Sequence, residues 1–494
     1  TQPNEQQKAV VAAYKSLMKD LFKMVGNSEA MAEKKMQAAF AIEDQIARQS
    51  YDQVKSRDPQ ANIHKMSWQD LLRDYPGIDW KQLCLAYGYP SDIDSVDVGQ
   101  PEPIHEVEKI LATADLFALK ATLEASVISS SVSLLSDDFV NRRFEYTKAV
   151  YGVKEQQPRW KRGLGFVQGL MGESIGKLYV AKYFPESSKQ RVVEMVHNLQ
   201  DAFAQRIGES TWMTDATKAK AIEKLRSMRI NIGYPDKWQN MEEYVQIDES
   251  KSLRANYDEI IPALRRRNLE KKWRKPVDKT VFACNPQMVN AFYAPTFNSI
   301  NFPAAILQAP FFDAEADDAA NYGAIGAVIG HEMSHGFDDQ GCQFDKDGNL
   351  NNWWTDEDKA NYSQRTKVLA DWFSAQEVQP GLKVNGEKTL GENIGDNGGI
   401  NVAFRALQNV MAKQPLPEKD GYSAAQRFFL SYARIWASNV APQFVAYLVN
   451  SDVHSPNHLR VNAALPHIDA WYEAWNIQPV DRLYLAPDKR AHIW

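Results

Sequence analysis

The chain has 494 residues, of which 44% are hydrophobic and 24% charged, proportions typical of a globular protein with two or three domains. Its 57 Lys and Arg residues against 63 Asp and Glu residues give a net charge of −6, which argues against a nucleic-acid partner. No apolar run reaches the roughly 20 residues of a membrane span, so we expect no transmembrane segment in this chain.

Helical periodicity dominates the first half of the chain, interrupted by a loop at 90–103 that is rich in Asp, Ser, Gly and Pro. Apolar residues at helical spacing predict helices within 5–58, 66–89, 105–135, 139–152, 163–206 and 215–230. Short strands are expected later, followed by three more helices. These strands are predicted at 280–283, 287–293 and 299–302, and the helices at 319–337, 390–410 and 426–436.

Three cysteines, Cys84, Cys284 and Cys342, are widely scattered along the chain. Their odd number and their spacing fit neither a disulfide framework nor a cysteine-ligated zinc site. We expect three buried free thiols.

The most informative motif is the sequence HEMSH at residues 331–335. Two histidines four residues apart on a helix lie on one face, so both imidazoles of His331 and His335 can bind the same ion. Glu332 projects beside them, where it can act on a water molecule held by that ion. This spacing is typical of a zinc site with one open coordination position.

A third protein ligand must come from elsewhere in the chain. The pattern HExxHxxGxxH would need glycine at 338 and histidine at 341, where this chain has Asp338 and Gly341. The segment GENIGDNGG instead offers Glu392 and Asp396, which share one face if the segment is helical. One carboxylate can bind zinc while the other accepts a hydrogen bond from a ligand imidazole.

A third polar cluster spans residues 452–462. An imidazolium there can stabilise the oxyanion that forms when water attacks a peptide carbonyl. His454, with Asp452 available to orient it, and His458 are both candidates for this role. Arg460 could bind a substrate carbonyl or carboxylate through its guanidinium fork.

Together these motifs resemble the neprilysin and endothelin-converting-enzyme family of zinc metallopeptidases, including its bacterial oligopeptidases. The resemblance rests on HEMSHGFDDQG, GENIGDNGG, DVHSPNHLRVN and the upstream VNAFYAPTFNSINFPAAILQAPFFD. It is specific over residues 285–494 and looser in the N-terminal half. It implies a mainly α fold, with a thermolysin-like gluzincin catalytic domain of α+β type at 256–494. A large helical lobe at 1–255 would enclose the substrate cavity.

The resemblance implies a zinc endopeptidase that cuts small peptides on the amino side of hydrophobic residues. One zinc ion per chain would be held by His331, His335 and Glu392, with Glu332 as general base. Two other classes of protein stay open: an inactive scaffold that captures peptides, and a structural or storage zinc protein.

Further roles also follow from the resemblance. Asp396 would pair with a ligand histidine, and His454 would be the transition-state donor. Asn290 and the backbone of Ala291 would hydrogen-bond an extended peptide, and Arg460 would contact its carbonyl beyond the scissile bond. The hydrophobic pocket for the residue after that bond would be lined by Ile306, Phe311, Val328, Ile435 and Trp436.

The chain departs from the family's animal members at two places. They end in Cys-x-x-Trp and carry a cysteine after the tryptophan that matches Trp436, where this chain has Ala491 and Ala437. The corresponding disulfide is therefore absent, which indicates a bacterial type. We expect a periplasmic or secreted location, with the cytoplasm as the alternative.

Family members also carry a substantial stretch before the region that matches Thr1. The sequence therefore predicts a truncated or nicked chain, whose missing N-terminal fragment is a possible partner beside the small peptide substrates.

Overall fold

The computed structural model describes residues 5–494, which form two compact units. Unit 1 contains the described residues up to Phe166, Met241–Val277 and Ala441–Tyr447. Unit 2 contains Val167–Asn240, Asp278–Val440 and Leu448–Trp494. The units are interleaved along the chain and do not follow a single boundary between residues 255 and 256. The expected division into a helical lobe and a catalytic domain stays a prediction.

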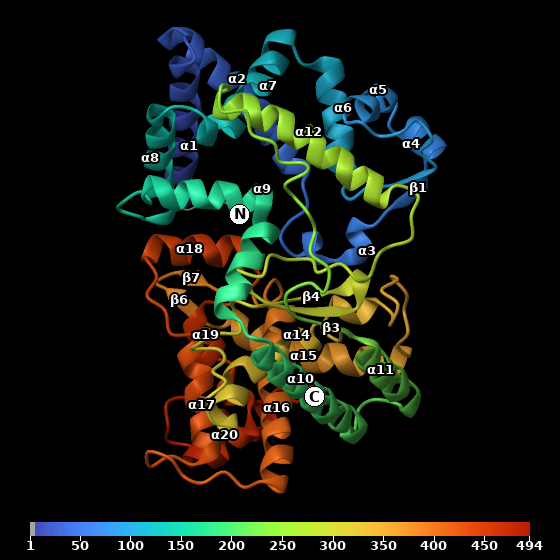
Figure 1. Ribbon diagram of the computed structural model, residues 1–494, viewed down its shortest axis with the longest axis vertical. Helices are drawn as coiled ribbons and strands as arrows, with labels where there is room; N and C mark the ends of the chain where they lie inside the picture. Colours follow the sequence, from blue (N-terminus) through green and yellow to red (C-terminus); the bar gives the residue numbers. More distant parts are fainter. Residues whose placement is uncertain (1–4) are drawn as a thin grey trace. The chain divides into compact units, whose positions relative to one another are not determined.

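Unit 1 is almost entirely helical (Figure 1). Its helices are α1 (Glu5–Met24), α2 (Glu29–Gln49), α3 (Pro59–Asn62), α4 (Trp68–Asp74), α5 (Trp80–Ala86), α6 (Pro101–Thr113), α7 (Leu116–Ser131), α8 (Asp137–Tyr151) and α12 (Leu253–Lys272). Strands β1 (Lys65–Ser67) and β2 (Ser95–Asp97) form a small antiparallel pair. The main core of this unit joins α1, α2 and α7 through buried apolar residues such as Phe22, Met36 and Ile128. Helices α9 (Arg159–Tyr183) and α18 (Pro442–Ser451) each have residues assigned to both units.

Unit 2 contains a three-stranded sheet and the helices that carry the predicted site. The helices are α10 (Glu186–Glu209), α11 (Asp215–Ser227), α13 (Asp318–Asn321), α14 (Ala327–Ser334), α15 (Asp356–Ser374), α16 (Leu390–Lys413), α17 (Ala424–Ile435), α19 (Asn457–Asn462) and α20 (Asp469–Trp475). A short hairpin of β6 (Glu377–Gln379) and β7 (Leu382–Lys383) follows α15.

The sheet has the strand order β3 (Arg229–Gly233), β5 (Ser299–Pro303), β4 (Phe292–Ala294). Strand β5 pairs parallel with β3 and antiparallel with β4, and all five of its residues are buried. A central strand covered on both faces is typically apolar, and Ile300 and Phe302 of β5 have no exposed surface.

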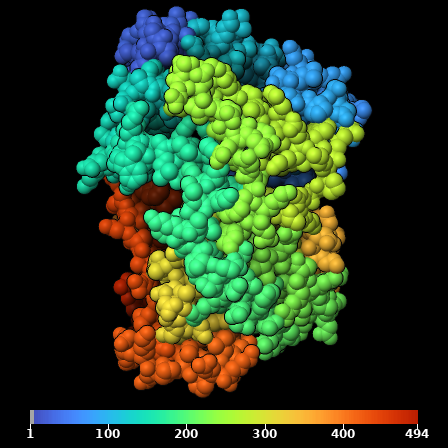
Figure 2. All heavy atoms as spheres, viewed as in Figure 1, coloured from blue at the N-terminus to red at the C-terminus, as the bar shows by residue number. Residues whose placement is uncertain are grey.

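Helices α14 and α16 pack closely because glycines face each other where the helices meet. A side chain at Gly330 would lie 2.9 Å from the Cα of Gly399, and one at Gly399 would lie 2.4 Å from the carbonyl oxygen of Ala327. Backbone contact of this kind leaves no room for a methyl group. Helix α10 packs against α16 and is exposed on the face of unit 2 drawn in Figure 2.

Several predicted elements differ from those observed. The helix expected at 215–230 ends at Ser227, because Arg229 already pairs with β5 in the sheet. The helix expected at 319–337 is divided by a π-helical turn, Tyr322–Gly326, and its last α-helical residue is Ser334. Strand β4 covers only the end of the strand expected at 287–293, and residues 280–283 are not a strand.

The loop expected at 90–103 contains β2 and the start of α6. Cys84, Cys284 and Cys342 are free, as predicted, but they are partly rather than fully buried. Among residues 5–494, no helix combines the length and the apolar character that crossing a membrane requires.

We expect Gly399→Ala to destabilise unit 2 by about 2–3 kcal/mol, because the new methyl group forces α14 and α16 apart. The control Gly208→Ala lies on α10 with nothing within 4 Å of the added carbon, and it should change stability by about 1 kcal/mol at most. Thermal unfolding of both variants measures the difference. Equal melting temperatures for both variants and the unmodified chain would contradict the close helix contact.

Buried His467 predicts a loss of stability in acid. Only 2% of its surface is exposed, and its Nδ1 accepts a hydrogen bond from the backbone N–H of Ala491. Burial, helped by nearby His492 and Arg490, lowers the pKa of His467 to about 4. The unfolded chain therefore binds the proton first as the pH falls, so this contribution is complete above pH 6.5 and lost towards pH 4.

The expected loss from this histidine is about 3 kcal/mol across that range. Chemical denaturation at pH 7 and pH 4.5 should therefore show a shallower pH dependence for His467→Phe than for the unmodified chain. Identical pH dependence of the two proteins would show that folding does not lower the pKa of this imidazole.

Candidate metal centre

Helix α14 presents the HEMSH motif inside unit 2. All eight residues of the helix are buried, and His335 follows as its C-terminal cap. The π-helical turn that precedes α14 is a type of irregularity often found beside functional sites. Glu332 is 5% exposed and lies next to His331 on the same helix.

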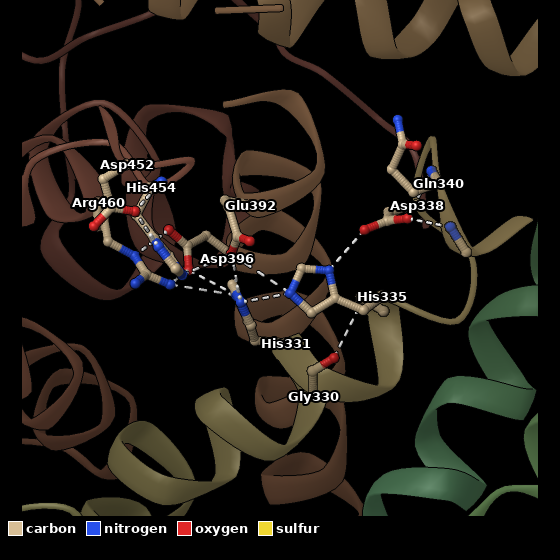
Figure 3. Close-up of polar contacts among 12 residues, drawn as sticks. Gly330, His331, His335, Asp338, Gln340, Glu392, Asp396, Asp452, His454 and Arg460 are labelled. Carbon is tan, nitrogen blue, oxygen red and sulfur yellow. Dashed lines mark hydrogen bonds and ion pairs between the residues drawn. The ribbon is translucent and has the colours of Figure 1, made fainter. Parts of the chain in front are cut away.

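Three atoms from two helices converge in front of α14 (Figure 3). The Nε2 atoms of His331 and His335 are 3.0 Å apart. Glu392 Oε2, from the first turn of α16, lies 3.2 Å from His331 Nε2 and 3.5 Å from His335 Nε2. These three residues are the group in the described part of the chain whose donor atoms could hold one metal ion.

The orientation of the two imidazoles suits a cation between them. Each Nδ1 faces a carboxylate, which can only accept a hydrogen bond, so the ring hydrogen resides on Nδ1 and Nε2 offers a lone pair. Two lone pairs 3.0 Å apart beside a carboxylate oxygen repel one another unless a cation lies among them. Ligands of a tetrahedral zinc ion are about 3.4 Å apart, close to the observed separations. The residues present therefore fit zinc.

The carboxylates that orient the rings come from different segments. Asp396 Oδ1 lies 3.0 Å from His331 Nδ1, and Asp338 Oδ2 lies 2.7 Å from His335 Nδ1 (Figure 3). Asp396 is one of the predicted residues. Asp338 was not predicted as a partner of a histidine ring, although its position three residues after His335 is the signal that could have identified it.

Charge in this cluster favours bound cations. Burial works against protonation of the rings, yet nearby carboxylates raise the pKa of His331 and raise that of His335 well above its usual range. Burial likewise opposes ionisation of Glu392, but the surrounding imidazoles lower its pKa well below the usual range. The imidazole and carboxylate atoms that bind protons in this cluster are the same atoms that would bind a metal ion in place of those protons.

Arg460 supports this arrangement from behind Asp396. Its guanidinium donates to both oxygens of Asp396, at 2.8 Å from Nε and 2.6 Å from Nη2, and stacks 3.7 Å from the centre of the Trp436 ring. Burial opposes the charge of Asp396, but Arg460 and His331 lower its pKa to about 2. The carboxylate beside His331 is therefore ionised at neutral pH.

His454 approaches the same carboxylate as the rings of His331 and His335. Its Nε2 lies 3.0 Å from Glu392 Oε2, and its Nδ1 lies 2.7 Å from Asp452 Oδ1 (Figure 3). Burial lowers the pKa of His454, but hydrogen bonds to Asp452 and Glu392 outweigh it and raise the pKa to about 9. His458, the other candidate, lies on α19 and is exposed, as is His454, so the contact with Glu392 distinguishes the two histidines.

Helix α16 and the residues just before it also hold the segment that carries His454. Ser455 donates to the side-chain oxygen of Asn393 at 2.9 Å, and buried Lys388 donates to the carbonyl of Val449 at 2.6 Å. These contacts fix the segment on both sides of His454. The contact of Ser455 with Asn393 links it to the helix turn that supplies Glu392.

The remaining predicted residues also belong to unit 2. Asn290 is exposed and Ala291 half-buried, immediately before the edge strand β4. The five predicted pocket residues are buried or partly buried and belong to, or pack against, the main hydrophobic core of the unit. They are Ile306, Phe311, Val328, Ile435 and Trp436.

Two histidines of an HExxH helix and a glutamate from a second helix define the ligand set of a gluzincin-type zinc metallopeptidase. The sequence pattern of Peptidase family M13 matches this chain in two parts, its N-terminal region at residues 1–235 and its peptidase region at residues 290–491. The chain belongs to this family of zinc metalloendopeptidases.

Related proteins agree with this membership. The chain is 33% identical to a neutral endopeptidase of Lactobacillus helveticus over 96% of this chain and 71% of the relative. It is 32% identical to neprilysin of Homo sapiens over 93% of this chain and 64% of the relative. It therefore spans about two thirds of the length of these relatives.

Solved structures show the same fold. A zinc metalloprotease of Mycobacterium tuberculosis, Zmp1, in complex with an inhibitor has a TM-score of 0.95 and 37% identity, covering 99% of this chain and 75% of that one. PepO of Lactobacillus rhamnosis has a TM-score of 0.91 and 29% identity, covering 100% of this chain and 76% of that one. The predicted resemblance and the mainly α, thermolysin-like fold class are both confirmed.

The ligand set predicts different effects for two carboxylates. Glu392→Ala should lose stoichiometric zinc, because it removes a donor atom. Asp396→Asn should keep the ion with about 10–100-fold weaker affinity, because it removes only the orienting charge beside His331. Elemental analysis and chelator competition on purified protein measure both effects. Full zinc content in Glu392→Ala would assign the third ligand to another residue.

Proposed function

We propose that this chain is a zinc-dependent endopeptidase that hydrolyses small peptides on the amino side of hydrophobic residues. The convergence of His331 Nε2, His335 Nε2 and Glu392 Oε2 within 3.0–3.5 Å of one another carries this proposal. Three protein ligands leave a fourth position for water, whereas a purely structural zinc site is closed by four protein ligands. One zinc ion per chain is expected.

Zinc held by these three residues would act as a Lewis acid and make water a nucleophile near neutral pH. Glu332 acts as the general base: it takes a proton from the attacking water and delivers it to the leaving amine. Its place beside His331 on α14 and its burial support this role. A buried carboxylate next to a metal ligand has little structural use in a protein that only binds peptides.

His454 supplies positive charge where the oxyanion develops. Its protonated ring is held by Asp452 through Nδ1, and its Nε2, which lies 3.0 Å from Glu392 Oε2, would donate to the carbonyl oxygen of the peptide under attack by turning away from that carboxylate. Arg460 is engaged by both oxygens of Asp396, so its first role is to keep His331 oriented. A contact of its guanidinium with substrate would have to use donors that Asp396 leaves free.

Substrate would bind as an extended strand. Strand β4 is at one edge of the sheet, where unpaired backbone groups can hydrogen-bond an added peptide strand. Asn290 and Ala291 precede this edge, and the apolar residues around Ile306 and Val328 offer a hydrophobic environment for the residue after the scissile bond.

We further propose a periplasmic or secreted location, with the cytoplasm as the alternative.

A fluorogenic peptide with a hydrophobic residue after the scissile bond tests the activity. Glu332→Gln should reduce the rate by about 10²–10⁴-fold, because it removes the proton acceptor while leaving the ligands in place. Zinc content of this variant should equal that of the unmodified chain.

Glu357→Gln provides the matched control, since it makes the same chemical change at an exposed position in the first turn of α15. It should leave the rate unchanged. Equal rates for Glu332→Gln and the control would remove the general-base role. Peptide binding without hydrolysis by the zinc-loaded unmodified chain would instead identify a binding scaffold.

A further inference from the structure

A buried lysine, Lys224, holds the loop that follows the HEMSH helix. It lies on α11 with 1% of its surface exposed. Its ammonium donates to three backbone carbonyls, those of Gly336 at 2.7 Å, Gly341 at 2.8 Å and Phe344 at 2.6 Å. An ammonium has three hydrogens, so these three acceptors satisfy it completely.

The loop held in this way contains the carboxylate that orients a zinc-binding ring. It begins directly after His335, and Asp338 lies between the first two carbonyls that Lys224 binds. Asp338 Oδ2 contacts His335 Nδ1 at 2.7 Å, while its Oδ1 accepts hydrogen bonds from the backbone of Gln340 and Gly341. The position of this carboxylate is thus set by the loop backbone.

The third carbonyl is fixed from a second direction. Trp353 Nε1 donates to the Phe344 carbonyl at 2.9 Å, and the rings of Phe337 and Trp353 lie 5.6 and 5.7 Å from the ammonium. Asn298 ties the backbone of Lys224 to that of Lys346, at 3.2 and 3.0 Å. The lysine and the loop are therefore held on both sides.

The chemistry of the site favours a positioning role over simple space filling. Removing an ammonium from water is unfavourable before its hydrogen bonds are counted, and an apolar side chain such as methionine would fill this volume without that desolvation. What lysine adds is three directional contacts to one short loop. Such contacts fix a backbone conformation that an apolar side chain would leave free.

We propose that Lys224 is a positioning residue of the metal centre, which fixes Asp338 and through it the ring of His335. This inference rests on the proposed function, in that His335 is taken as a zinc ligand. Loss of a hydrogen-bond partner of a ligand histidine typically weakens metal binding by about 10–100-fold. A change 112 residues away in the sequence from Gly336 should therefore alter zinc affinity.

The test compares zinc affinities by chelator competition, with thermal unfolding of the apo proteins as a second measurement. Lys224→Met and Asp338→Asn should each weaken zinc binding by about 10–100-fold. Because both act through the same ring, the double variant should be no weaker than the worse single variant, within about twofold. Lys224→Gln keeps two donors on a shorter side chain and serves if Lys224→Met does not fold.

Thr217→Val on the same helix is the matched control. It removes a buried hydrogen bond from Thr217 to Asp358, at 2.5 Å, in a region that carries no ligand. It should lower the melting temperature and leave zinc affinity within about twofold of the unmodified chain.

Folded Lys224 variants that bind zinc as tightly as the unmodified chain would overturn the proposal, as would losses that multiply in the double variant. Failure of the unmodified chain itself to bind zinc would refute the proposed function instead.

Discussion

Backbone contact between α14 and α16 is the constraint on which the centre depends. The two helices meet at Gly330 and Gly399, and this approach brings Glu392 within 3.2 Å of His331. Gly395 extends the contact, since a side chain there would lie 2.7 Å from the His331 ring. Each glycine in a helix costs about 1 kcal/mol relative to alanine. That cost is offset by a ligand geometry that bulkier residues would not permit.

Around this contact, basic and acidic side chains lie next to one another. The two imidazoles each face a carboxylate on one side and the ligand position on the other, and the carboxylate of Asp396 in turn faces Arg460. The buried charges of Asp396 and Arg460 thus pair with opposite sign, which is the condition under which buried charges are tolerated. The ammonium of Lys224 is stabilised by three backbone carbonyls instead of an acidic side chain.

The sequence predicted those features that depend on spacing along one helix. HEMSH and the four-residue step from Glu392 to Asp396 are of this kind, and the structure brings these residues together as the predicted motifs require. The helical first half was likewise evident from its apolar period. Features that depend on packing between distant segments were not predicted: the π-helical turn before α14, the early end of α11 where β3 pairs with β5, and the carbonyl contacts of Lys224.

Asp338 illustrates the difference. The sequence shows that Asp338 is three residues after His335. Whether its carboxylate turns back to the His335 ring depends on the loop conformation, which contacts of Gly341 and Lys224 fix. Arg460 is similar: the sequence assigned its fork to substrate, whereas two of its hydrogen bonds are taken by a carboxylate on α16. Side chains with several possible partners are assigned only when the tertiary contacts are known.

The pairing of Asp396 with Arg460 also bears on how the protein is made. These residues are 64 positions apart, and the histidines and glutamate that would hold the metal all precede Arg460 in the chain. A ribosome releases the N-terminal part of a chain first. For an interval during translation the nascent polypeptide therefore contains His331, His335 and Glu392 while the guanidinium that pairs with Asp396 is still missing.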